Sequence, residues 1–109
     1  MNKDLELIRG SGNVFRDLGH PRADVEQLKS ILAAAIIGVL DDRKLSVRKA
    51  EGVTGINASE FSRIRTAQLG RFTVDRLITI LNRLNRRVDV QVTTRPFAAG
   101  EATPALGAE

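Results

Sequence analysis

The sequence predicts a single, mainly α-helical domain that carries a short β-strand near its C-terminal end. A chain of 109 residues, 42% of them hydrophobic, has the size of one domain with one modest core. Apolar residues recur at helical spacing through most of residues 24–85, in segments that begin at polar capping residues. The pattern then changes to strict alternation at Val88, Val90 and Val92, which is typical of a strand with one buried face.

The composition of the two ends predicts three parts along the chain. Residues 1–23 contain several glycines and no sustained helical pattern, so we expect an N-terminal arm of short extended or turn segments. Residues 24–95 form the folded domain with its C-terminal strand, and residues 96–109 are small, polar and rich enough in Gly and Pro to predict a flexible tail. The N-terminus lacks the apolar centre of a signal peptide, and cysteine is absent. We therefore expect a cytoplasmic protein.

The longest predicted helix covers residues 24–42. Asp24 is a suitable N-cap, and apolar residues follow at helical spacing from Val25 to Leu40. Their broad distribution around the helix predicts burial on more than one side.

Three shorter helices are predicted at residues 46–54, 57–65 and 73–85. Each begins at a polar N-cap, with one apolar residue before the cap and another four positions after it, an arrangement in which the two apolar side chains pack together. The sets are Leu45, Ser46 and Ala50; Ile56, Asn57 and Phe61; and Phe72, Thr73 and Leu77. Glu60 stands three residues after Asn57, the spacing of a capping box.

The first two of these short helices are separated by a break at Gly55. Glycine adopts the left-handed conformation that ends a helix at little steric cost, and Asn57 can cap the next helix two residues later. Two short helices joined by such a turn cross steeply, as in a helix-turn-helix, and Ile56 would fill the space between them. With Phe61 and Ile64 toward the core, the second helix leaves small, polar and basic side chains toward solvent: Ala58, Ser59, Ser62, Arg63 and Arg65.

Positive charge is concentrated in the part of the chain that contains this break. Residues 43–95 hold twelve Lys/Arg and four Asp/Glu, a net charge of +8, whereas the chain as a whole carries +4. Such a distribution indicates a polyanionic partner, although a solvated basic surface without a partner is the alternative. An exposed helix with Ser and Arg suits a DNA major groove, where Arg pairs with guanine, while helix N-termini suit phosphates. The candidate DNA-binding residues are Ser46, Arg48, Asn57, Ala58, Ser59, Ser62, Arg63, Arg65, Gln68, Arg71 and Thr73.

Two arginines of the last predicted helix are not assigned to the DNA-binding surface. Arg76 and Arg83 are seven residues apart, and we interpret them as one solvent-facing side of a helix.

The only histidine, His20, stands beside Pro21, and neither a phosphate-binding glycine loop nor a metal-ligand spacing is present, so we expect no enzyme, cofactor or metal. Stacking aromatics for RNA and a basic amphipathic helix for a membrane are also missing.

Three stretches together resemble a known family: GSGNVFRDLG (Gly10–Gly19), LSVRKAEGVTGINASEFSRI (Leu45–Ile64) and LGRFTVDRLITIL (Leu69–Leu81). They resemble the Xre/Cro-type helix-turn-helix proteins of the lambda-repressor-like fold, and within them the HigA-like antitoxins. The resemblance implies a bundle of about five helices that binds a palindromic operator in double-stranded DNA as a homodimer. In the antitoxin branch it also implies repression of the protein's own operon and neutralisation of a ribonuclease toxin.

Several positions depart from what the resemblance implies. Val47 stands where the family often has a DNA-contacting Gln, and Arg65 replaces a common Glu. Glu51 stands where a small Ala is usual, so we expect it to need a partner such as Arg63 or Arg65. Two alternatives stay open: a stand-alone Xre-family repressor with no toxin partner, and an interaction protein that mainly neutralises a toxin and binds DNA weakly.

Overall fold

The computed structural model describes residues 23–100. Among the described residues, 28–89 form one compact unit, and 23–27 and 90–100 lie outside it. The motif at Gly10–Gly19, most of the predicted arm and the end of the tail therefore lie outside the described residues. The predicted boundaries at residues 23/24 and 95/96 stay a prediction.

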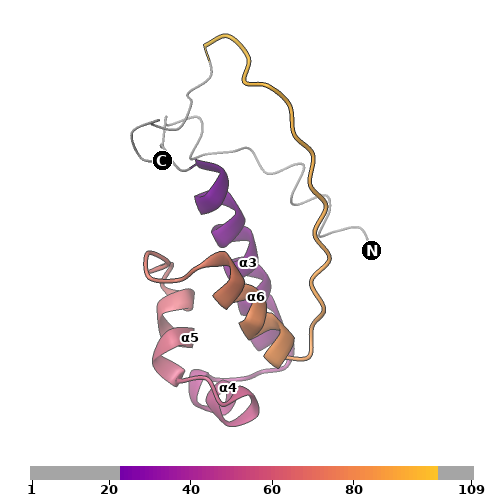
Figure 1. Cartoon of the computed structure of the whole chain (residues 1–109). Helices are drawn as coiled ribbons and strands as arrows, with labels where there is room; N and C mark the ends of the chain where they lie inside the picture. The colour runs from indigo at the N-terminus through magenta and orange to yellow at the C-terminus, as the bar shows by residue number, and fades with distance from the viewer. Residues whose placement is uncertain (1–22, 101–109) are drawn as a thin grey trace. The chain divides into compact units, whose positions relative to one another are not determined.

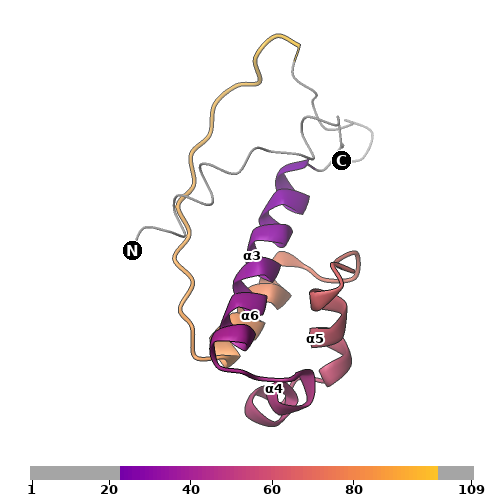
Figure 2. The same ribbon diagram turned by 180° about the vertical axis from the view of Figure 1, so that it is seen from behind.

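Within residues 23–100 the chain forms four helices, which is the mainly α-helical fold predicted from the sequence. They are α3 (Ala23–Asp42), α4 (Val47–Thr54), α5 (Ala58–Arg65) and α6 (Val74–Arg83). In both views α6 overlaps the second half of α3, and α5 turns away from α4 instead of continuing its axis (Figures 1 and 2). Asp24 lies inside the first turn of α3 and is not its cap, since the helix already includes Ala23.

The prediction of a C-terminal strand is wrong, because residues 86–98 have no regular secondary structure and no β-strand occurs between residues 23 and 100. A strand needs a hydrogen-bonded partner strand, and the described chain offers none. Val88 packs against the core, whereas Val90 and Val92 are 60% and 75% exposed. The sequence therefore alternates like a strand, but within the described residues no partner strand supplies the hydrogen bonds that would make it one.

The core of the unit formed by residues 28–89 is mostly aliphatic and includes two buried aromatic side chains, Phe61 and Phe72. Phe61 is fully buried, and the largest side chains buried with it are Ile and Leu: Ile36, Leu40, Ile64, Leu77, Ile80 and Leu84. The apolar partners predicted around the three caps all belong to this core or pack against it. Their burial confirms the prediction that the apolar residues on either side of each N-cap pack at the start of the helix.

The break between α4 and α5 is held by a small set of hydrogen bonds around Thr54. Gly55 has φ 76°, and its N–H donates to the Glu51 carbonyl at 2.7 Å. The buried Thr54 hydroxyl donates to the Ala50 carbonyl at 2.7 Å and accepts from the Ile56 N–H at 3.0 Å. Ile56 is 3% exposed, as the sequence predicted. A left-handed glycine and a bridging hydroxyl thus fix the direction in which α5 leaves the turn.

Arg83 is exposed, as expected, and Arg76 is half-buried, but both make tertiary hydrogen bonds that the sequence did not predict. Arg76 forms a bidentate pair with Glu60 at 3.0 and 2.8 Å, which joins α6 to α5. Arg83 donates to the Thr54 carbonyl at 3.0 Å, which joins α6 to the end of α4. The guanidinium groups thereby hold both halves of the broken helix against one scaffold helix.

Candidate nucleic-acid interface

The position of α5 is set by its own cap and by two buried residues. The Asn57 side chain accepts from the Ser59 N–H at 2.8 Å, which confirms Asn57 as the N-cap. Phe61 and Ile64 are buried in the core. The remaining face bears Ser59, Ser62 and Arg65, which are exposed, with Ala58 and Arg63 half-buried. The side of α5 that the sequence predicts to be exposed therefore does face solvent.

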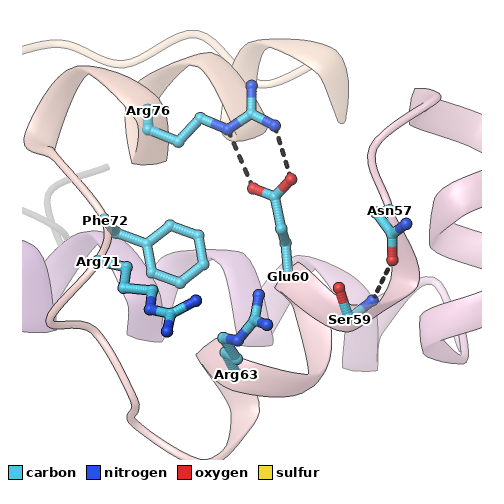
Figure 3. Close-up of a pocket in the computed structure, with 7 residues that line it drawn as sticks. All are labelled: Asn57, Ser59, Glu60, Arg63, Arg71, Phe72 and Arg76. Atoms are coloured by element: carbon cyan, nitrogen blue, oxygen red, sulfur yellow. Dashed lines mark hydrogen bonds and ion pairs between the residues drawn. The ribbon is translucent and has the colours of Figure 1, made fainter.

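An open hollow lies between α5 and the segment that leads into α6. Its lining residues are Asn57, Ser59, Glu60, Arg63, Arg71, Phe72 and Arg76. Figure 3 shows the Glu60–Arg76 pair on one side of it and the Arg63 and Arg71 guanidinium groups on the other. Neither Arg63 nor Arg71 makes a side-chain hydrogen bond or ion pair within the described part of the chain. These two cations are consequently available to an anion or a base edge from outside.

Arg65 differs from these two arginines because it has an acidic partner. Its Nη2 lies 2.8 Å from Asp41 Oδ1 at the end of α3, and its side chain is 35% exposed. An ion pair this exposed contributes about 0–1 kcal/mol, so a phosphate can compete for the guanidinium.

Two further helix N-termini flank α5, and their charges differ. Ser46 caps α4 by accepting from the Lys49 N–H at 3.1 Å, and the first turn of α4 contains basic residues and no acid. Thr73 caps α6 by accepting from the Arg76 N–H at 3.1 Å, but Asp75 stands in that first turn. A hydrogen bond from the Thr73 hydroxyl lowers the pKa of Asp75 below its ordinary value of 3.8, so this carboxylate stays charged. The N-terminus of α4 is therefore the more favourable of the two for a phosphate.

At the end of α5, the candidate residue Gln68 forms a hydrogen bond with Thr66. Gln68 Nε2 donates to Thr66 Oγ1 at 3.0 Å, and Thr66 Oγ1 donates in turn to the Ser62 carbonyl at 3.0 Å. Gln68 is thus held at the exit of α5, exposed but with its amide donor engaged locally.

Two carboxylates have partners that the sequence did not indicate. Glu51 was expected to pair with Arg63 or Arg65, but its Oε1 accepts from the Ala58 N–H at 3.3 Å. Glu60 was expected to complete a capping box, but it pairs with Arg76. Both partners are set by the tertiary arrangement: Glu51 reaches across the turn, and Glu60 reaches another helix. The only local signal was the presence of a carboxylate at position 51 where the resemblance implies a small residue.

The part of the chain that the structure describes contains neither a candidate membrane span nor a candidate metal site. None of the helices between residues 23 and 100 combines the length and apolar character needed to cross a bilayer. No group of three or more His, Cys, Asp or Glu in that part of the chain is placed to hold a metal ion.

Comparison with known proteins agrees with the two-helix geometry. Searches of curated proteins and of solved structures give no match. A family model described as a helix-turn-helix domain matches residues 14–93, which is most of the chain and includes α3 through α6. The chain belongs to this helix-turn-helix domain family.

Proposed function

We propose that the protein is a sequence-specific DNA-binding transcriptional regulator that inserts α5 into the major groove. One observation carries this proposal. Phe61 and Ile64 anchor α5 in the core, while its outward face carries small polar residues and Arg63, whose side chain has no hydrogen-bond or ion-pair partner within residues 23–100. A short, rigid helix with this face is the element that reads base edges in helix-turn-helix proteins.

We assign roles to the candidate residues according to the elements on which they stand. Ala58, Ser59, Ser62 and Arg63 stand on α5, where base edges are read. Ser46 and Arg48 at α4, with Arg71 and Thr73 before α6, lie on either side, where a phosphate backbone would run. Gln68 stands at the end of α5 and combines its local hydrogen bond with a contact to the sugar–phosphate chain. Asn57 caps the start of α5 through its side-chain oxygen, and its side-chain NH2 donates to a base edge. Arg65 contacts a phosphate only after it leaves Asp41.

The salt dependence of binding tests this proposal. Three cations (Arg48, Arg65 and Arg71) are assigned to phosphates in this proposal, so the slope of log K against log salt is expected to be about −3 per protomer. Fluorescence anisotropy with a labelled 24-bp duplex pool measures it. Arg48→Ala should reduce the steepness by about one. A native chain whose affinity for DNA does not change with salt would contradict the proposal.

We further propose that the protein acts as a homodimer on a palindromic operator. The support is the resemblance to Xre/Cro-type proteins, which implies a homodimer. A symmetric pair would place two α5 helices about one DNA turn apart, ~34 Å. Sedimentation equilibrium at micromolar concentration should give twice the chain mass, and a monomer there would refute the dimer.

The finer assignment as an antitoxin rests on the resemblance to HigA-like antitoxins. It predicts a neighbouring gene whose ribonuclease product is toxic without this protein and tolerated with it. Expressing that neighbour alone decides between this assignment and a stand-alone repressor, since a harmless neighbour leaves only the latter. An interaction protein that mainly holds a toxin would instead show toxin binding with weak affinity for DNA.

A further inference from the structure

We propose that Glu51 is a specificity-determining residue of the interface. Its carboxylate excludes phosphate from the N-terminus of α5 and accepts a hydrogen bond from the exocyclic amino group of a base at that place. The inference rests on the proposed DNA-binding function, and it concerns a residue on α4 that sequence reasoning did not assign to the interface.

The first step is the position of the carboxylate. Glu51 lies on the outward side of α4 and is exposed, and its Oε1 lies 3.3 Å from the backbone nitrogen of Ala58, the first residue of α5. Its second oxygen, Oε2, makes no hydrogen bond within residues 23–100. The Ala58 N–H therefore orients one oxygen and leaves the other free to accept.

The second step concerns the other donors at this end of α5. The Ser59 N–H donates to the Asn57 side chain at 2.8 Å, and the Glu60 N–H donates to the Asn57 carbonyl at 3.0 Å. With Ala58 held by Glu51, the backbone donors of the first turn already have acceptors inside the protein. A phosphate would have to displace one of them and would meet a negative charge while doing so.

The third step is the contrast with the neighbouring helix. In the first turn of α4 only the Lys49 N–H is taken by a side chain, and the charges there are those of Arg48 and Lys49. Phosphate is therefore favoured at α4 and disfavoured at α5, although both helix N-termini carry the same partial positive charge. Glu51 is the residue that makes the two ends chemically different.

The last step is what a carboxylate selects in the major groove. Cytosine N4 and adenine N6 present amino donors there, whereas guanine O6 and N7 and thymine O4 present only acceptors. An oriented carboxylate thus favours an amino-bearing base and repels the acceptor edges. The two consequences, fewer non-specific phosphate contacts and a preferred base, come from one charge.

Glu51→Gln tests the inference because it keeps an oxygen that can accept from Ala58 and removes the charge. The probes are a random-sequence 24-bp duplex and a selection from a randomised duplex pool. Affinity of the variant for the random duplex should rise roughly tenfold at low salt. In the selection, one base position per half-site should lose a preference of at least about fivefold for cytosine or adenine.

Two further variants complete the experiment. Asp42→Asn, at the exposed end of α3, changes the net charge equally and should leave both readouts as in the native chain. Glu51→Ala, which also removes the hydrogen bond to Ala58, should behave like Glu51→Gln. If the native chain selects a motif and both Glu51 variants select the same motif with unchanged random-duplex affinity, the inference is overturned and the DNA-binding function stands. If the native chain binds no duplex, the proposed function fails as well.

Discussion

Replacing Phe61 with alanine is expected to lower the free energy of unfolding by about 3–5 kcal/mol. The ring is fully buried in the core formed by all four helices, and its Ile and Leu neighbours include Ile36, Leu40, Leu77 and Ile80. Phe72 is the other buried aromatic side chain among the described residues, so the core holds little bulk that could refill the space. The truncation removes apolar contacts and leaves a cavity in a unit of modest size.

Urea denaturation followed by circular dichroism measures this effect. Ser62→Ala is the matched control, because Ser62 is the next residue on α5, is exposed, and makes no side-chain hydrogen bond within the described residues. It should shift the unfolding free energy by no more than about 0.5 kcal/mol. A Phe61→Ala protein as stable as the control would mean that α5 is not fixed on this core, and the proposed reading surface would lose its rigid support.

The start of each short helix and the stop at Gly55 could be predicted because the signals are local, whereas the last helix ends at Arg83, two residues before the predicted end. A side-chain oxygen at Ser46, Asn57 or Thr73 accepts from an N–H two or three residues later, and this hydrogen bond does not depend on tertiary contacts. The left-handed turn at Gly55 likewise depends on the residue itself. The outward face of α5 followed from the same logic, since burying Phe61 and Ile64 fixes which side chains remain outside.

The parts that sequence reasoning missed depend on pairs that are distant in sequence. Glu60 and Arg76 are separated by 16 residues, and Arg83 and Thr54 by 29 residues. Nothing in the spacing of one helix indicates which carboxylate or carbonyl on another helix an arginine will meet. The alternating valines after residue 87 led to a wrong strand prediction for a related reason. A strand depends on a partner strand, and the pattern of one segment does not show whether a partner exists.

Replacing Arg63 with alanine is expected to weaken binding to the selected operator by about 1–3 kcal/mol, which is a loss of roughly fivefold to 150-fold. Arg63 stands on the outward side of α5, beside the hollow next to Arg71, and no acid within residues 23–100 neutralises either group. If Arg63 reads a guanine, its loss should relax one position of the operator. Arg71→Ala should instead weaken binding to all sequences alike, because a phosphate contact carries no base information.

Titrations of a labelled operator and of a scrambled duplex at one salt concentration separate these two patterns. Arg86→Ala is the control for charge, since Arg86 is exposed and follows the end of α6, whereas Arg71 precedes its beginning. A ten-residue helix separates the two by about 15 Å, so the control removes a cation without touching the proposed groove. Its affinity should fall only slightly and equally for both duplexes. If the double variant Arg63→Ala with Ser62→Ala binds the operator as tightly as the native chain, α5 is not the helix that enters the groove. The search for the DNA-binding surface would then move to the basic residues of α4 and of the segment after α6.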